Sequence, residues 1–124
     1  MIVELKPAGE RVPNTVGAPY PTLLEGRSDV LEIAISHRSD TTYRVIDKSG
    51  LASIWPAGMF DVVDNTVPDG WILIPGRGGG LMITHGRFAR AGFWEDYFDG
   101  HPDAVEEFAD VVSELGGGRY PVNR

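Results

Sequence analysis

Residues 93–115 read FWEDYFDGHPDAVEEFADVVSEL, and their spacing decides the fold class of this chain. Beyond residue 101 the apolar residues recur at intervals of three and four, as on one face of a helix: Val105, Phe108, Ala109, Val112 and Leu115. Proline suits a first helical turn and glycine suits the position after the last. Pro102 and Gly116 therefore predict a helix from about Pro102 to Leu115. A shorter helix is expected over residues 93–98, where aromatic side chains cluster.

The same stretch concentrates the negative charge of the chain. It contains eight acids and no lysine or arginine, whereas the whole chain of 124 residues has 18 acids, 11 basic residues and a net charge of -7. We call these eight acids the acidic helical face: Glu95, Asp96, Asp99, Asp103, Glu106, Glu107, Asp110 and Glu114. Directly before them, residues 76–92 carry Arg77, Arg87 and Arg90 and no acid. The chain is thus expected to be a nearly neutral body with an acidic face.

Upstream of residue 92 the apolar residues alternate with a period of two, which predicts strands. Strands are expected at Ile2–Leu5, Asp29–Ser36, Thr42–Asp47, Leu51–Trp55, Phe60–Val63, Trp71–Ile74 and Leu81–Thr84. Short strands followed by helices predict an α+β domain with a small, strongly bent antiparallel sheet or a partly open barrel. Strand order does not follow from this pattern.

Length and composition indicate one domain over residues 1–116. It divides into an extended arm rich in proline and glycine (1–28), the antiparallel sheet (29–84) and the acidic helices (93–115), and a flexible tail follows at 117–124. The chain has no cysteine, no apolar run of membrane-spanning length and no signal-peptide pattern at its first residues. A cytoplasmic location is expected, without a membrane partner.

Motifs for catalysis and for cofactors are not found in the sequence. The three histidines, His37, His85 and His101, form no H-x-x-x-H pair that would set metal ligands on one helical face. The glycine-rich segment 76–80 matches neither phosphate-binding pattern, and no serine has the context of a nucleophile. We therefore expect no catalytic residue, no metal and no cofactor. A small enzyme that uses His85 and Arg87 with nearby acids is the least favoured alternative.

Three segments carry a resemblance to known proteins: Tyr43–Gly50, Trp55–Val63 and Phe93–Gly100. They resemble small bacterial single-domain proteins with an SH3-like sheet and a helical end. The size and acidity of the chain are similar to those of immunity proteins, which neutralise secreted bacterial toxins. This resemblance implies a toxin inhibitor with an SH3-like barrel, and it implies no role for any individual residue.

Aromatic side chains among carboxylates are typical of a protein-binding surface that faces a basic partner. The candidate partner-binding residues are Trp94, Glu95, Asp96, Tyr97, Asp99, Asp103, Glu106, Glu107 and Asp110, together with Arg77 on the glycine-rich turn. The expected partner is a protein with a basic surface, such as a secreted toxin domain. Nucleic acid is not expected, because an acidic chain cannot displace counterions from phosphates.

An adaptor or self-assembling module is the alternative to an inhibitor. In that case the sheet edge or the Arg77 turn makes the contact, and the acidic face serves only solubility. One form of self-association would join the basic stretch 77–90 of one copy to the acidic helices of another.

Overall fold

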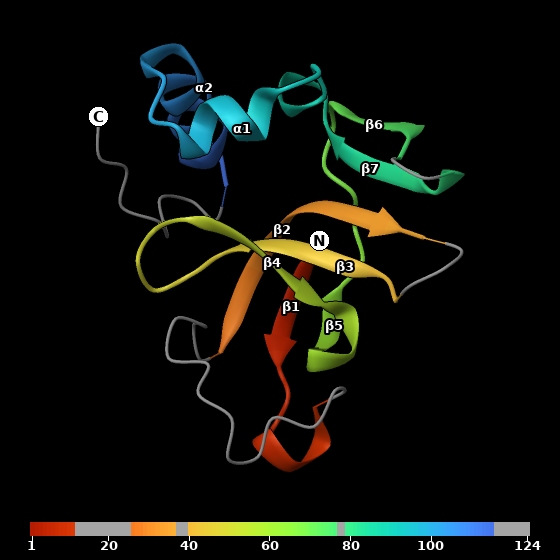
Figure 1. Ribbon diagram of the computed structural model, residues 1–124. Helices are drawn as coiled ribbons and strands as arrows, with labels where there is room; N and C mark the ends of the chain where they lie inside the picture. The colour runs from red at the N-terminus through yellow and green to blue at the C-terminus, as the bar shows by residue number, and fades with distance from the viewer. Residues whose placement is uncertain (12–25, 37–39, 77–78, 116–124) are drawn as a thin grey trace.

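Strands form in this chain where β-branched and aromatic side chains lie between turns. The computed structural model describes residues 1–11, 26–36, 40–76 and 79–115, and within these ranges seven strands form one antiparallel sheet (Figure 1). The strands are β1 (Ile2–Leu5), β2 (Arg27–Ile35), β3 (Thr42–Ile46), β4 (Ala52–Pro56), β5 (Phe60–Asp64), β6 (Trp71–Pro75) and β7 (Leu81–His85). Every strand predicted from the alternating pattern is present, with ends that differ by no more than two residues.

The strand β2 joins the two halves of the sheet. Residues 27–29 pair with β1, which in turn pairs with β5, whereas residues 32–35 pair with β7. The other edge of β2 pairs with β3, and β3 pairs with β4. The ladder between β2 and β3 skips Leu31, and a bulge of this kind bends a strand. Within the described residues β4, β5 and β6 each pair with a single neighbour, so the sheet is open.

The N-terminal strand β1 lies inside the sheet, between β2 and β5. We expected this segment to belong to an extended arm over residues 1–28. It enters the sheet because Val3 and Leu5 alternate with Glu4 and bury their side chains in the core. The remainder of the expected arm, residues 12–25, and the expected tail, residues 117–124, lie outside the described residues.

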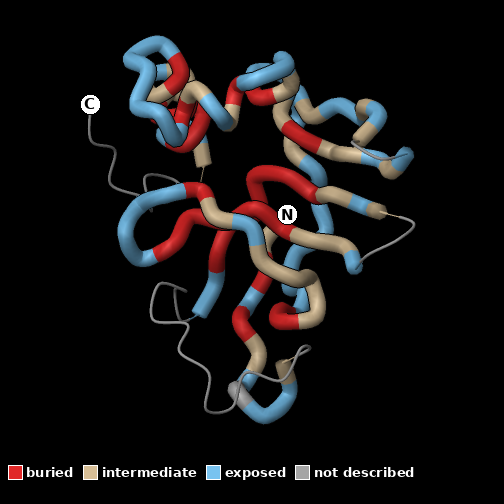
Figure 2. The backbone as a smooth tube through the Cα atoms, in the orientation of Figure 1, coloured by how far each residue is buried: buried red, intermediate tan, exposed pale blue. Residues whose placement is uncertain are grey.

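Buried residues lie in the central strands and in the helical region (Figure 2), and the hydrophobic ones form two clusters. One cluster joins Leu31 and Ile46 to the rings of the helical region, and the other gathers Tyr43 and Val45 with side chains from β1 and β5. Successive residues of β3 therefore belong to different clusters, as the pleat of a strand requires. The central strands are buried on both faces.

The helical region covers one face of the sheet (Figure 1). A 3-10 turn, η4 (Gly86–Phe88), connects β7 to the helices α1 (Phe93–Phe98) and α2 (Pro102–Ser113). The predicted helix is thus present and ends two residues before Leu115, which is half-buried. Neither of these helices has the length and apolar character that a membrane crossing requires. Two further 3-10 turns, η1 (Ala8–Glu10) and η2 (Ala57–Met59), follow β1 and β4.

Candidate functional site

Glu32 lies at the centre of a polar network between the sheet and the helices. The register places it between Arg44 of β3 and Thr84 of β7. Its Oε2 atom accepts a hydrogen bond from Trp94 Nε1 at 2.6 Å and another from Thr84 Oγ1 at 3.3 Å. Only 4 % of Glu32 is exposed. The Glu32 carboxylate is therefore removed from water and has neighbours on β3, β7 and α1.

Arg44 supplies the positive charge beside this carboxylate. The residue is 7 % exposed, and its Nε atom lies 3.9 Å from Glu32 Oε2. Its Nη1 atom donates to the carbonyl of Ala52 at 3.2 Å, and its guanidinium lies 4.0 Å from the centre of the Trp94 ring, as in a cation–π contact. Burial lowers the pKa of Arg44, and the charge of Glu32 opposes that shift. The pair fastens α1 to the sheet.

Tyr97 provides a second attachment of α1 to the sheet. Its hydroxyl oxygen accepts a hydrogen bond from the backbone N–H of Ala52 at 3.3 Å, and its ring centre lies 4.5 Å from that of Phe108. Burial raises the pKa of the Tyr97 hydroxyl. Tyr97 is buried and Trp94 is half-buried, so both aromatic residues that we expected to meet a partner pack against the core.

The acids of the two helices fall into two groups. Glu95, Asp99, Asp103, Glu106 and Glu114 are exposed, and Asp96, Glu107 and Asp110 are half-buried. Members of the second group form ion pairs with arginines of the same chain. The surface that faces solvent is thus formed mainly by the first group.

Arg87 and Arg90 account for those ion pairs. Arg87 Nε donates to Glu107 Oε1, and Arg87 Nη2 lies 3.6 Å from Asp110 Oδ2. Arg90 Nη1 lies 3.0 Å from Asp96 Oδ2. The hydrogen bond from Arg87 lowers the pKa of Glu107. Two of the three arginines of the expected basic stretch are therefore used within the chain, which weakens the idea that this stretch pairs with a second copy. The third, Arg77, lies outside the described residues.

Phe98 is an exposed aromatic residue that we did not single out as a candidate. It is the last residue of α1, it is 52 % exposed, and it directly precedes Asp99. The helical period indicates this exposure. Tyr97 lies one turn after Phe93 on the buried side of α1, and Phe98 is rotated about 100° around the helix axis from Tyr97. Phe98 is the exposed aromatic ring of the acidic helical face.

The histidines described by the structure are not gathered into a site. His85 Nδ1 accepts a hydrogen bond from the backbone N–H of Arg87 at 3.1 Å and so caps η4. His101 is exposed and precedes α2, and His37 lies outside the described residues. Within residues 1–11, 26–36, 40–76 and 79–115, no three acidic or histidine side chains lie close enough to share a metal ion.

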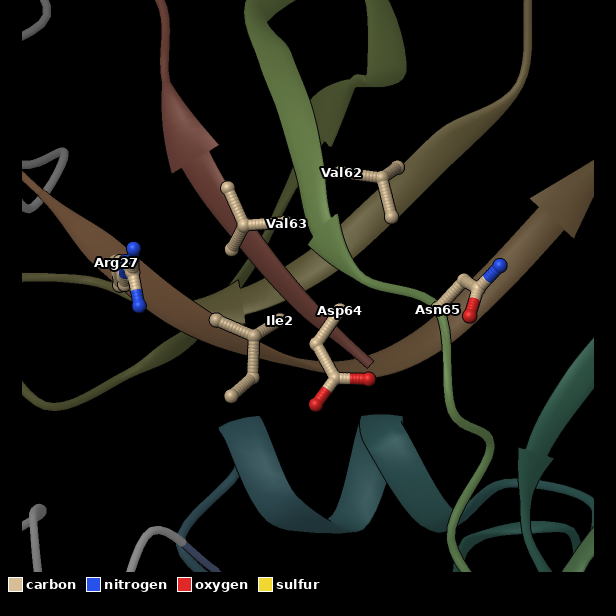
Figure 3. A pocket seen from close by; sticks show the side chains of 6 residues that line it. All are labelled: Ile2, Arg27, Val62, Val63, Asp64 and Asn65. Atoms are coloured by element: carbon tan, nitrogen blue, oxygen red, sulfur yellow. The ribbon is translucent and has the colours of Figure 1, made fainter.

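An open hollow lies beside β1 and β5 (Figure 3). Its lining consists of Ile2, Arg27, Val62, Val63, Asp64 and Asn65. The charged groups in it already have neighbours. Arg27 Nε lies 3.9 Å from a carboxylate oxygen of Glu4, and Asp64 Oδ1 accepts the Thr66 N–H at 2.9 Å, a bond that lowers the pKa of Asp64. Arg27 and Asp64 are therefore engaged in contacts within the chain.

Comparisons with known proteins find no relative. No family model, no curated protein and no solved structure matches the chain. The function must therefore be inferred from the surfaces of this molecule, and the acidic helical face with Phe98 is the strongest candidate among them.

Proposed function

We propose that this protein is a non-catalytic binding domain of the immunity type, whose acidic helical face blocks a cationic site on a partner protein. The observation that carries the proposal is the exposed ring of Phe98 at the end of α1, next to Asp99, on a pair of helices rich in exposed carboxylates. Aromatic residues at the centre of an interface supply most of its binding energy, and the surrounding polar groups exclude water.

The attachment of α1 to the sheet supports this role. Trp94 binds Glu32 beneath the helix, and Tyr97 binds the backbone of Ala52. A surface held in this way loses little conformational entropy when a partner binds. Preorganisation of this kind favours tight inhibition by a small domain.

The distribution of charge supports it as well. Asp103 and Glu106 are one turn apart on α2, and both are exposed. Clustered carboxylates attract a cationic partner over a long range and accelerate the encounter, in a way that added salt weakens. In this proposal the partner is a secreted toxin domain with a basic surface, the protein acts in the cytoplasm, and its open sheet is related to the SH3-like barrel.

Variants of the acidic helical face, compared with a control at other exposed acids, test the proposal. The face variant combines Asp99→Asn, Asp103→Asn and Glu106→Gln, and a separate variant carries Phe98→Ala. A matched control removes three exposed acids from β1 and β5 by Glu4→Gln, Asp61→Asn and Asp64→Asn. Partners are captured from lysate of the native cells, identified by mass spectrometry and titrated against each purified variant at two salt concentrations.

We expect the control to bind the captured partner like the native protein. The face variant should lose about tenfold or more in affinity together with much of the salt dependence, and Phe98→Ala should weaken binding with the salt dependence retained. A face variant that binds with unchanged affinity and unchanged salt dependence would exclude this surface as the interface.

A further inference from the structure

The hairpin β6–β7 exposes apolar side chains on both of its faces. Ile72 is 42 % exposed and Leu73 is 61 % exposed, although neighbouring residues of a strand point to opposite sides. Among the described strands, β6 pairs with β7 alone, so its other edge is free. No residue of β6 carries a charge, and its proline, Pro75, lies at the last position of the strand. Uncharged apolar edges pair readily with other strands.

The hydrogen-bonding groups on the free edge follow from the ladder. Gly76 N–H donates to the Gly80 carbonyl at 2.8 Å at one end of the hairpin, and Gly86 N–H donates to the Gly70 carbonyl at 2.9 Å at the other. In an antiparallel pair, hydrogen-bonded positions alternate with positions whose backbone groups point away. The even-numbered residues of β6 therefore bond to β7, and the odd-numbered ones direct their N–H and C=O groups outward.

We propose that a second copy of this chain binds to this edge, with β6 of each copy antiparallel and the two-fold axis at Ile72. In this register Trp71 of one copy faces Leu73 of the other, and all four outward backbone groups of Trp71 and Leu73 form hydrogen bonds. A two-fold axis at Leu73 is less favourable, because Trp71 would then face Pro75, which has no N–H.

The self-complementary hydrogen-bonding pattern and the absence of charge on β6 favour a second copy as the occupant. Each copy has a net charge of -7, so two copies repel each other as a whole. Because β6 has no charged residue, pairing of two β6 strands adds no repulsion between their side chains. Ile72 and Leu73 each expose roughly half of an aliphatic side chain. Together they provide apolar surface on the order of 100 Å² per copy. A standard stable interface buries about 800 Å² per partner, so we expect a weak, concentration-dependent dimer.

Sedimentation equilibrium over a concentration series up to about 1 mM tests whether this edge associates. The native protein should rise above its monomer mass of 13.5 kDa with increasing concentration, and added salt should leave the association unchanged or strengthen it. Leu73→Lys should abolish the association. Ile54→Lys, on the edge strand β4 with a similar exposure of 54 %, should not. A native protein that stays at 13.5 kDa, or equal effects of the two lysines, would overturn the proposal.

Cysteine crosslinking tests the register without a charged substitution. The chain has no cysteine, so each variant carries a single thiol. Ile72 would face its own copy with Cα atoms about 4.5 Å apart, within disulfide reach, whereas Ile74 would be separated from its copy by four positions. Under mild oxidation, Ile72→Cys should form a crosslinked dimer, and Ile74→Cys and Ile54→Cys should remain monomers. Equal crosslinking of all three variants, or none by Ile72→Cys, contradicts this register and the proposed dimer.

Discussion

Glu32→Gln replaces the buried carboxylate of the network with an amide of the same shape. The amide oxygen can still accept the hydrogen bond from Trp94 Nε1, so the substitution removes the charge and little else. Arg44 then stays buried against the Trp94 ring without the Glu32 carboxylate, and among carboxylates only the smaller Coulombic effect of Glu95 still favours its charge. The free energy of unfolding should fall because a poorly compensated charge remains in the core.

The distance between the charges sets the size of this effect. At 3.9 Å and with an effective dielectric constant of about 20, the attraction between Glu32 and Arg44 is about 4 kcal/mol. Breaking a buried pair by removing one partner costs about 3–5 kcal/mol, which agrees with that value. For a domain of this size a loss of 1 kcal/mol lowers Tm by roughly 4 °C, so Glu32→Gln should lower it by about 12–20 °C.

A double-mutant cycle measures the coupling directly. The four proteins are the native chain, Glu32→Gln, Arg44→Met and the double variant, each unfolded in urea and followed by tryptophan fluorescence and circular dichroism. The double variant should be less destabilised than the sum of the two single variants by about 2 kcal/mol or more, because neither charge remains without its partner. Glu107→Gln, which breaks a half-exposed pair with Arg87, should cost less than about 1 kcal/mol and serves as the control.

Two results would refute this reasoning. One is a Glu32→Gln protein whose free energy of unfolding is within about 1 kcal/mol of the native value, since the buried charge would then be tolerated. The other is a double variant whose destabilisation equals the sum of the single ones, since the two residues would then act independently.

The remaining predictions concern a surface ion pair and a backbone contact. Arg87→Gln should return the pKa of Glu107 toward its ordinary value, as measured by NMR titration, because the lowering arises from the hydrogen bond with Arg87. Because the pKa of Glu107 is lowered in the folded state, its ion pair stabilises the protein above the ordinary glutamate pKa, and this stabilisation is lost as the pH falls through the lowered pKa. The free energy of unfolding of Arg87→Gln should therefore decrease less than that of the native protein over this range of acid pH. Gly80→Ala should cost about 1–3 kcal/mol or more in urea unfolding, because a Cβ there would collide with the Ile35 carbonyl oxygen. Gly9→Ala, where a Cβ meets no atom within 4 Å, should cost much less.

The alternation in β2 shows how far the sequence can be followed. Leu31, Ile33 and Ile35 alternate with Glu32 along the chain, and in a regular strand they would lie on the side opposite to Glu32. In the structure Ile35 is exposed and Glu32 is buried. The bulge at Leu31 interrupts the regular alternation, so Leu31 joins the cluster beneath the helices and Ile33 joins the other cluster. Both faces of the middle of β2 are therefore covered, and the end of the strand at Ile35 is not.

The candidate site also combines features that the sequence predicts with features that depend on tertiary contacts. The concentration of acids on the helices follows from counting residues, and so does the near-neutrality of the rest. Which acids pair with Arg87 does not follow, because η4 and α2 meet only after the chain has folded back on itself. Trp94 and Tyr97 were selected for their position among carboxylates, and the packing of α1 turned both toward the core and left Phe98 exposed.

Taken alone, the sequence determined the α+β class, the positions of the strands, the α2 helix and the location of the charge. These are local properties, because the period of apolar residues reflects the geometry of each element by itself. The tertiary structure decided the pairing of strands around β2, the burial of Glu32 with Arg44 beneath Trp94, and the free edge of β6. These depend on which distant elements meet, and the free energy of such contacts arises from desolvation and packing between elements rather than from any single stretch of chain.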